Sequence, residues 1–338
     1  MIDGHGDDLH NYKDIKYNFS SNVFHGDLDQ DLLIYLQDKV HMVANYPPTD
    51  FSYLADPLAA KLSISSDQLL FTNGATEAFY LFAQCYARKK GMIVIPSFSE
   101  YEDAAKAHHQ NITFVSHDDV TSRTITDDVV YIGNPNNPDG KVIPIDQIEN
   151  LLGRNPNTVF MVDEAYIEFT GSTKSCVPLI IDHDNLVIIK SFTKVFSIPG
   201  LRLGYMLSCG ENIQKFRKLT IPWNVNVLAV EAGKFILDNY ERLSFNKKKL
   251  LQQAGAFFHQ LTSIGWLKPY PSHTHYFLIE LQKGKASQLK RYLAEKHHIL
   301  IRDANNFRGL EGEHIRLTMQ NEEANLELMA ALNAWTIN

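Results

Sequence analysis

The sequence has few cysteines, no long apolar run and no signal-peptide pattern, and each absence argues against one class of protein. The 338 residues include only three cysteines, which lie far apart without CxxC spacing, so the sequence predicts neither a disulfide framework nor a zinc site. No apolar run reaches the eighteen or more residues that a membrane helix needs. The first twelve residues are acidic and polar, unlike a signal peptide. We therefore expect a soluble, cytoplasmic protein.

Positive charge is also in deficit. The chain has 32 Lys and Arg against 39 Asp and Glu, a net charge of -7, which argues against nucleic acid or a membrane surface as a partner. A local basic pocket for an anionic small molecule is compatible with this balance. The apolar fraction of 44% and the charged fraction of 21% are typical of globular proteins, and the length allows two domains.

Short apolar runs alternate with amphipathic segments from about residue 68 to residue 189. Unbroken apolar strands separated by helices are typical of a mostly parallel sheet that helices cover on both faces. We therefore predict a three-layer α/β/α domain. The expected strands are 68–72, 92–95, 112–115, 129–132, 159–162 and 186–189, and the expected helices are 28–43, 56–63, 72–88, 101–109 and 145–152.

After Tyr205 the pattern changes to that of a smaller α+β unit. Residues 211–262 look largely helical, including the charged stretch 240–261. The division predicted from this change is a large domain at 31–240, a small domain at 241–338, and an N-terminal segment, 1–30, that packs with the small domain. The tail is expected to hold strands at 276–280, 299–302 and 314–319, a helix at 286–296 and a last helix from Glu322.

A lysine between hydroxyl residues follows the strand expected at 186–189. Lys194 could form a Schiff base with a carbonyl compound, while the hydroxyls of Ser191 and Thr193 and the guanidinium of Arg202 hold a phosphate. Pyridoxal phosphate carries both groups. The alternative is a solvated loop lysine and a surface arginine, and these residues alone do not decide between the two.

Other polar residues follow the neighbouring strands, where ligands gather in a doubly wound sheet. Asp163 could keep a pyridine nitrogen protonated, which makes the ring an electron sink. Tyr166 and Asn137 could hydrogen-bond the phenolic oxygen of the ring. Residues 74–76 begin a helix and offer free N–H groups to a phosphate. Each feature has an ordinary structural reading, as a cap or a turn, but the set in this order favours a pyridoxal-phosphate site.

The stretches TNGATE (72–77), GNPNNPDG (133–140), VDEAY (162–166), SFTKVFSIPGLRLGY (191–205) and HIRLTM (314–319) resemble those of the fold-type I, aspartate-aminotransferase-like superfamily of pyridoxal-phosphate enzymes, over nearly the whole chain. The resemblance implies a role for each matching residue. Lys194 would carry the Schiff base, Asp163 would face the ring nitrogen, Tyr166 and Asn137 would face the phenolic oxygen, and Phe98 would stack on the ring. The phosphate would be held by Gly74, Ala75, Thr76, Ser191, Thr193 and Arg202. Arg316 would take the substrate carboxylate, and Tyr46 would reach the cofactor phosphate of a second subunit in a homodimer with shared sites.

Two branches of this superfamily are similar to the chain: threonine-phosphate decarboxylases of cobalamin synthesis and histidinol-phosphate aminotransferases. Both bind phosphorylated amines, and both carry an arginine like Arg302. The stretches 5–7 with 18–22, 96–102, 222–226 and 306–310 look more like the decarboxylases, and the aminotransferases usually have tyrosine in place of Phe98. His5 and Asn22 are further candidate substrate contacts. The sequence departs from many relatives at His275–Tyr276 and at Asp7, where a glycine is usual, which leaves the substrate less certain than the cofactor.

The expected activity is decarboxylation of L-threonine O-3-phosphate to (R)-1-aminopropan-2-yl phosphate and CO2. The alternative is amino transfer from histidinol phosphate to 2-oxoglutarate, since sequence does not show which Cα bond stands perpendicular to the ring. A non-catalytic regulator on the same fold is disfavoured, because only about thirty polar residues precede the first helix. His273 and His275 could share a strand face, but no third ligand is evident, so no metal is predicted.

Overall fold

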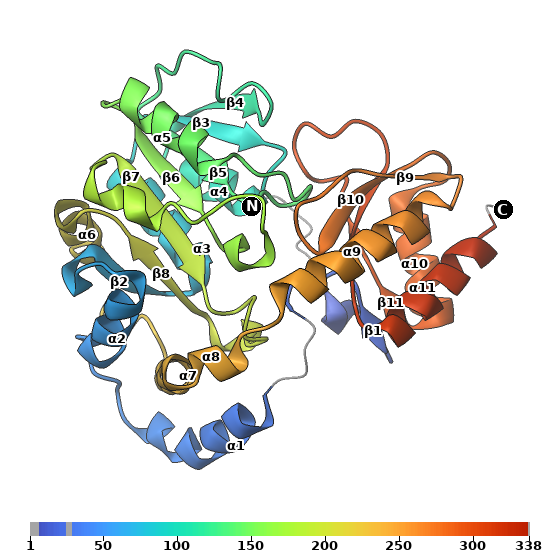
Figure 1. Cartoon of the computed structure of the whole chain (residues 1–338), viewed down its shortest axis with the longest axis horizontal. Helices are drawn as coiled ribbons and strands as arrows, with labels where there is room; N and C mark the ends of the chain where they lie inside the picture. Colours follow the sequence, from blue (N-terminus) through green and yellow to red (C-terminus); the bar gives the residue numbers. More distant parts are fainter. Residues whose placement is uncertain (1–6, 25–28, 337–338) are drawn as a thin grey trace.

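The computed structural model describes residues 7–24 and 29–336. They form a larger part around a seven-stranded sheet and a smaller part that holds the C-terminal strands and helices (Figure 1). The N-terminal strand lies in the smaller part. Strand β1 (Tyr17–Asn18) pairs in parallel with β11 (Ile299–Leu300), so the two ends of the sequence meet in the smaller part.

The large sheet has the strand order β2-β8-β7-β6-β5-β3-β4. All its strands run parallel except β8, which is antiparallel to both of its neighbours. The predicted three-layer fold with a mostly parallel sheet is confirmed. The strands are β2 (Leu69–Asn73), β3 (Lys90–Ile95), β4 (Asn111–Ser116), β5 (Val129–Gly133), β6 (Val159–Asp163), β7 (Leu186–Ser191) and β8 (Leu203–Leu207).

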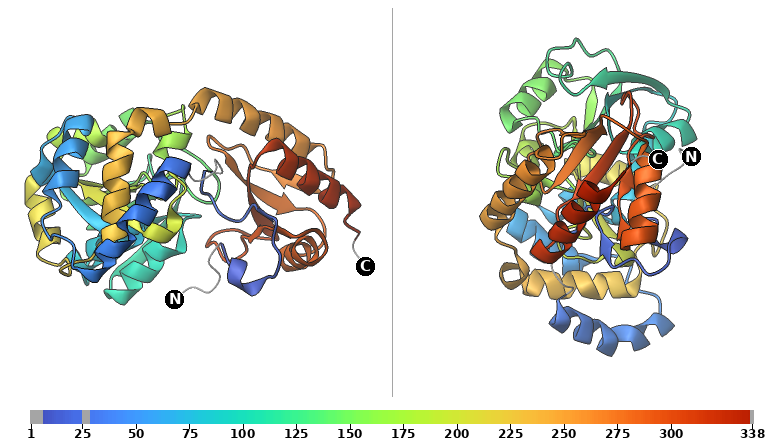
Figure 2. Two further views of the ribbon diagram at one scale, coloured as in Figure 1. Left: turned by 90° about the horizontal axis from the view of Figure 1, so that it is seen from below. Right: turned by 90° about the vertical axis from the view of Figure 1, so that its right-hand side faces the viewer.

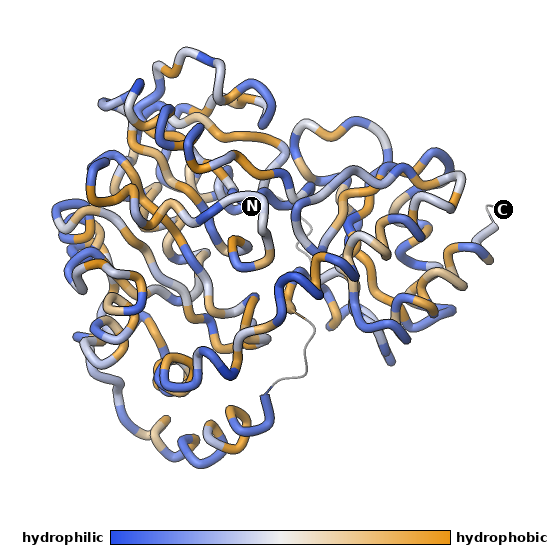
Figure 3. The backbone as a smooth tube through the Cα atoms, in the orientation of Figure 1, coloured by the Kyte–Doolittle hydropathy of each residue, from blue (hydrophilic) through white to orange (hydrophobic). Residues whose placement is uncertain are grey.

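Helices cover both faces of this sheet, and this explains why its central strands read as unbroken apolar runs. Every residue of β5 and β7 is buried, and the hydropathy colouring shows these strands in orange inside the larger part (Figure 3). One face packs against α2 (Ser52–Leu62), α5 (Ile145–Arg154) and α7 (Val227–Asp238); the other packs against α3 (Gly74–Cys85), α4 (Ser99–Ala107) and α6 (Gly210–Arg217). Helix α1 (Gln30–Lys39) lies outside α7 (Figure 2).

The smaller part is built on an antiparallel sheet with the order β12-β13-β10-β9. Its register sets Arg302 of β12 opposite Arg316 of β13. Phe19, next to β1, is fully buried in the same core. The elements are β9 (Leu267–Pro269), β10 (Tyr276–Leu281), β12 (Arg302–Asp303) and β13 (His314–Thr318), with helices α9 (Lys247–Thr262), α10 (Ala286–His297) and α11 (Glu322–Ala334).

Several expected elements differ from the structure. The charged stretch 240–261 is not one helix, because α8 (Tyr240–Leu243) ends at Ser244 and α9 starts only after Asn246, whose side chain caps it by accepting a hydrogen bond from the Lys249 N–H. The strand expected at 299–302 is two short strands, since β11 pairs with β1 and β12 pairs with β13. Helix 56–63 begins earlier, at Ser52.

The division into domains stays a prediction, and the packing of the chain supports it. The apolar core around the large sheet draws on residues 32–243, while the second core draws mainly on residues 250–335 together with Phe19. The predicted boundary at residue 240 coincides with the start of α8. Among the residues that the structure describes, no helix is long and apolar enough to cross a membrane.

Candidate active site

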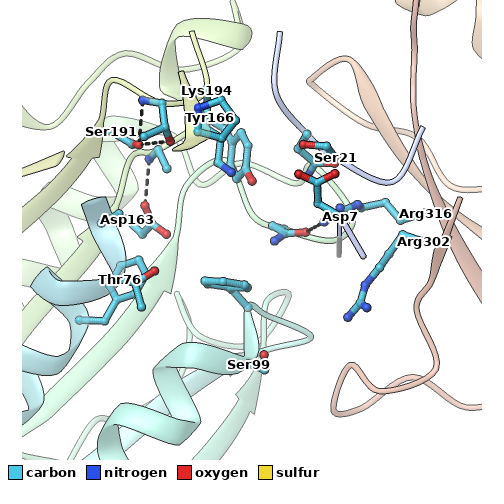
Figure 4. A pocket seen from close by; sticks show the side chains of 18 of the residues that line it. Asp7, Ser21, Thr76, Ser99, Asp163, Tyr166, Ser191, Lys194, Arg302 and Arg316 are labelled. Atoms are coloured by element: carbon cyan, nitrogen blue, oxygen red, sulfur yellow. Dashed lines mark hydrogen bonds between the residues drawn. The ribbon is translucent and has the colours of Figure 1, made fainter. Parts of the chain in front are cut away.

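The carboxyl ends of the parallel strands and one edge of the smaller part enclose a cavity of about 470 Å³. Figure 4 shows Lys194, Tyr166, Asp163 and Thr76 on the side of the larger part, and Arg302 and Arg316 entering from the smaller part. Nearly all residues singled out from the sequence meet here. Those that line the cavity are Asn22, Ala75, Thr76, Phe98, Asn137, Asp163, Tyr166, Ser191, Thr193, Lys194, Arg202, Arg302 and Arg316.

A cradle without side chains lies where β2 passes into α3. Gly74 has a φ of +72°, and an added Cβ there would clash with the Arg202 guanidinium. On the adjacent strand β8, a Cβ at Gly204 would lie 2.6 Å from the Gly74 carbonyl carbon and 2.7 Å from the Ala75 nitrogen. The two glycines therefore let the backbone and a guanidinium come together at a helix N-terminus, whose first N–H groups have no partner within the helix.

Hydroxyls and a half-buried cation complete this cradle. The Ser191 and Thr193 hydroxyl oxygens lie 2.7 Å apart, and the Thr193 N–H donates to Ser191 Oγ. Arg202 donates to the Pro199 carbonyl at 3.0 Å, and burial lowers the pKa of its guanidinium. Within residues 7–24 and 29–336 no carboxylate pairs with Arg202. A half-buried cation beside free N–H groups is suited to an anion from outside the chain.

Asp163, at the end of β6, is the buried carboxylate of the cavity. Its Oδ1 accepts a hydrogen bond from the Ala165 N–H at 2.9 Å, and its Oδ2 accepts one from the Tyr101 hydroxyl at 2.5 Å. Burial raises the pKa of Asp163 to about 6, against the opposing effects of these two hydrogen bonds and of the Lys194 charge. An ionised carboxylate held in this way at a strand end can pair with a cationic ring nitrogen.

Asn137 and Arg316 connect the two parts of the molecule. Arg316 donates through Nη1 to Asn137 Oδ1 and through Nη2 to the Ser20 carbonyl, both at 2.5 Å. The amide nitrogen of Asn137 is thereby turned away from Arg316. The Arg316 side chain is 5% exposed, and its Nε has no hydrogen-bond partner among the described residues. A buried donor without a partner is costly, which indicates a site for an acceptor.

A second arginine lies beside Arg316. Arg302 donates to Asn306 Oδ1 at 2.8 Å, and burial together with the neighbouring charge of Arg316 lowers its pKa to about 10. Asn22 accepts a hydrogen bond from the Thr318 hydroxyl at 2.7 Å, and its Nδ2, buried as well, has no partner in the described part of the chain. This end of the cavity is therefore rich in cationic and neutral donors.

Among the described residues, two that were singled out from the sequence do not line the cavity. Gly74 lies behind the cavity lining, against Arg202. Tyr46 does not reach the cavity of its own chain. It is 79% exposed, and its ring packs at a tilt against that of Trp223, with 4.7 Å between the ring centroids. His5 lies outside the described residues.

Of the residues that depart from the superfamily pattern, Asp7 lines the cavity, whereas His275 and Tyr276 do not. Asp7 lines the cavity near the two arginines (Figure 4) and accepts a hydrogen bond from Asn18 Nδ2. Tyr276 lies behind the lining, where its hydroxyl donates to the Asn136 carbonyl at 2.8 Å and its ring packs edge-on against Tyr166. His275 packs on Phe169.

Sequence reasoning missed three residues of the cavity lining. Tyr101, three residues after Phe98, lines it with its hydroxyl on Asp163, and Asn306 and Phe307 line the end that carries Arg302. All three lie in stretches noted for their resemblance, 96–102 and 306–310, but the resemblance assigned them no role. The i, i+3 spacing of Phe98 and Tyr101 at a helix start is a signal that both point to one side.

The fold and the cavity define a class: an α/β protein that holds an anion at the ends of parallel strands, beside a lysine and a buried carboxylate. Comparison with known proteins specifies it further. Residues 14–332 match the family described as "Aminotransferase class I and II". The chain belongs to this family, and its similar proteins are fold-type I pyridoxal-phosphate enzymes.

Several relatives are similar over most of their length. The crystal structure of L-threonine-O-3-phosphate decarboxylase from Porphyromonas gingivalis has 35% sequence identity and a TM-score of 0.90, covering 94% of this chain and 98% of that one. Threonine-phosphate decarboxylase from Salmonella typhimurium is 27% identical, over 93% of this chain and 90% of its own. Histidinol-phosphate aminotransferase 1 from Carboxydothermus hydrogenoformans is 31% identical, over 84% of each chain.

The cofactor of the chain is pyridoxal 5′-phosphate, and the cavity fits it. A phosphate matches the cradle of helix N–H groups and hydroxyls beside Arg202, which pairs with no carboxylate in the described part of the chain. A pyridine ring beneath Phe98 would have Asp163 within the same cavity for its nitrogen. Lys194 is the amine available for the aldehyde.

Proposed function

We propose that the protein decarboxylates L-threonine O-3-phosphate to (R)-1-aminopropan-2-yl phosphate and CO2. One observation carries the proposal: two buried arginines, Arg302 and Arg316, lie opposite each other on paired strands at one end of the cavity. Two adjacent cations favour a substrate with two anionic groups. L-threonine O-3-phosphate carries a carboxylate and a phosphate in one small molecule, whereas histidinol phosphate has no carboxylate.

The proposed roles of the substrate-side residues follow from their partners. Arg316 takes the carboxylate, since its unpartnered Nε is buried and Asn137 and the Ser20 carbonyl fix the rest of its guanidinium. Arg302, with Asn306 beside it, takes the phosphate, and Asn22 Nδ2 donates to one of the two anions. His5 stays a proposed phosphate contact from the sequence.

The remaining residues support bond cleavage. When bound, pyridoxal phosphate supplies an aldehyde that condenses with the substrate amine and a protonated ring that accepts the electron pair of the broken Cα bond. Asp163 would hold the proton on the ring nitrogen, and Tyr166 and Asn137 would donate to the phenolic oxygen. Arg316 would orient the substrate carboxylate so that the Cα–carboxylate bond is the one that breaks. Lys194 would donate the proton that replaces CO2 at Cα.

Amino transfer is the second candidate, and the similarity to histidinol-phosphate aminotransferase 1 favours it. In that case Arg302 would bind the phosphate of histidinol phosphate, and Arg316 a carboxylate of the amino acceptor. Lys194 would then take the Cα proton instead of returning one. The two candidates would use the same residues and differ in which Cα bond breaks.

An assay with matched substrates tests the proposal. The loaded enzyme is incubated with L-threonine O-3-phosphate, O-phospho-L-serine, or histidinol phosphate plus 2-oxoglutarate, and CO2 and glutamate are measured. The proposal expects CO2 from L-threonine O-3-phosphate and none with Lys194→Ala. Glutamate from the third mixture, with no CO2 from the first, would refute decarboxylation. Faster CO2 release from O-phospho-L-serine would keep the reaction but change the substrate.

We further propose a homodimer in which Tyr46 reaches the cofactor phosphate of the other subunit. The surface around Tyr46 supports it, because several large apolar side chains are exposed there or on the preceding helix. They are Ile34, Val40, Val43, Ile221 and Trp223.

Mixed dimers separate this arrangement from a role of Tyr46 in its own subunit. Co-expressed Tyr46→Ala and Lys194→Ala chains would form dimers with one intact site only if Tyr46 acts across the interface. Half of the dimers are then mixed, and we expect about one quarter of the wild-type activity. Activity no greater than the sum of the two single variants would contradict the shared site.

A further inference from the structure

Tyr101 lies directly beneath the cavity with its hydroxyl on Asp163. It belongs to the first turn of α4, is 2% exposed, and donates to Asp163 Oδ2 at 2.5 Å. This is the only hydrogen bond of the Tyr101 hydroxyl among residues 7–24 and 29–336. Each carboxylate oxygen of Asp163 thus has one donor from the chain, and each keeps a further lone pair for the cavity side.

Packing fixes the position of this hydroxyl. The Tyr101 ring meets Phe79 edge-on at 4.9 Å and Phe98 edge-on at 6.1 Å between centroids, and it stacks on Tyr131 at 6.3 Å. The strand below ends in Gly133, where an added Cβ would lie 3.3 Å from the Tyr101 oxygen. A ring enclosed on these sides has no freedom to turn its hydroxyl to another acceptor.

The protonation states make Tyr101 a permanent donor. Burial, followed by the charge of Asp163, raises the pKa of Tyr101 well above its ordinary value, so the phenol keeps its proton throughout the physiological range. Burial raises the pKa of Asp163, and the hydrogen bond from Tyr101 lowers it again. The charges that act on Asp163 from the surrounding elements are those of Lys194, which favours the anion, and Glu164, which opposes it.

A carboxylate paired with a pyridine nitrogen shares one proton with it. When a donor stabilises the carboxylate anion, the proton stays on the nitrogen; when that donor is lost, the carboxylate becomes the better base and takes the proton. A neutral pyridine is a poorer electron sink than a pyridinium. We propose that Tyr101 is a positioning residue that keeps Asp163 ionised and aimed at the cofactor, and thereby keeps the cofactor ring nitrogen protonated. This rests on the proposed role of Asp163.

The test reads the ring nitrogen itself. The enzyme is loaded with pyridoxal phosphate labelled with 15N at the ring, and the nitrogen resonance is recorded for the wild type, Tyr101→Phe and Tyr131→Phe. Tyr131 is a matched control, because its ring lies in the same core, is fully buried, and donates its hydroxyl to Gln110 Oε1 instead. We expect Tyr101→Phe to move the resonance toward that of neutral pyridine and to lower kcat about 10- to 100-fold, the effect of one hydrogen bond to a charged group. Tyr131→Phe should leave the resonance in place.

Two outcomes would overturn the inference, and Asp163→Asn distinguishes between them. If Tyr101→Phe keeps the wild-type resonance while Asp163→Asn shifts it, Asp163 acts without Tyr101. If Asp163→Asn also keeps it, Asp163 does not face the ring nitrogen, and the proposed cofactor arrangement fails as well. If Tyr101→Phe does not retain the cofactor, Tyr101→Met supplies the same readout, since methionine fills an apolar gap without a strong donor.

Discussion

Replacing Arg302 by glutamine tests whether this arginine recognises a phosphate. Arg302 is 5% exposed, and removing one partner of a buried, hydrogen-bonded charge pair costs about 2–5 kcal/mol. At about 1.4 kcal/mol per tenfold, kcat/KM for L-threonine O-3-phosphate should fall roughly 30- to 5,000-fold. L-threonine has no phosphate for Arg302 to bind, so kcat/KM for its much slower decarboxylation should change less than about threefold, an effect below about 0.7 kcal/mol.

Stability should move in the opposite direction to activity. The pKa of Arg302 is lowered to about 10 by burial and by Arg316, so the native state disfavours its charged form at every pH below about 10. A lowered pKa of a buried cation means that the charged form costs folding free energy, on the order of 3 kcal/mol for a shift of this size. Arg302→Gln removes this penalty, and we expect a midpoint of thermal unfolding a few degrees above that of the wild type, without added ligand.

The assay follows CO2 release from both substrates for the wild type, Arg302→Gln and Arg291→Gln. Arg291 is an exposed cation on α10, and its substitution removes the same charge away from the cavity. Equal losses for L-threonine O-3-phosphate and L-threonine would refute the assignment, because Arg302 would then support the active site in general. A comparable loss with Arg291→Gln would show that net charge alone produces the effect.

Three further predictions concern the cradle, the buried carboxylate and the contact between the two parts. Gly204→Ala should weaken cofactor binding, because its Cβ would lie 2.6 Å from the Gly74 carbonyl carbon, an overpacking cost of about 1–3 kcal/mol. Gly153→Ala, whose Cβ would have nothing within 4 Å, should bind the cofactor normally, and cofactor titration measures both. Because burial raises the Asp163 pKa to about 6, the free energy of unfolding of the apoprotein falls by about 3 kcal/mol as pH rises from 4 to 6. Asp163→Asn should therefore unfold at a higher denaturant concentration than the wild type at pH 8, and a lower midpoint would contradict this. Glu102 holds Arg308 of the loop after β12 by two hydrogen bonds of 2.7 Å, so Glu102→Gln should raise KM about three- to tenfold with little change in kcat, and an unchanged KM would show that the loop keeps its place without this pair.

Much of the fold could be predicted, because the central strands are buried on both faces and read as compact apolar runs. Strand β8 was not predicted as a strand, since its residues 203–207 stood at the end of a stretch considered only for its chemistry. The connection from β7 to β8 has only eleven residues, 192–202, which is too short for the crossover that a parallel strand needs. Connection length was therefore the signal that could have predicted an antiparallel strand here.

The cavity was predictable where chemistry follows a strand directly, as for Asp163 and Lys194. It was not predictable where a contact depends on packing between elements. Tyr101 reaches Asp163 only because the first turn of α4 brings its hydroxyl to the ends of β5 and β6, and Ser20 meets Arg316 through its carbonyl, a group that every residue carries. Side-chain type says nothing about such a backbone acceptor.

The pairing of the two chain ends has a consequence for synthesis on the ribosome. Phe19 accepts a hydrogen bond from the Thr318 N–H through its carbonyl, and Asn22 accepts one from the Thr318 hydroxyl, so Phe19 and Asn22 are made well before their common partner. About 300 residues separate them, and at roughly 5–20 residues per second the N-terminal strand waits about 15–60 s for its partner. The large sheet can form in that interval, but the substrate end of the cavity cannot. A nascent chain should thus acquire its cofactor cradle well before it can recognise a substrate.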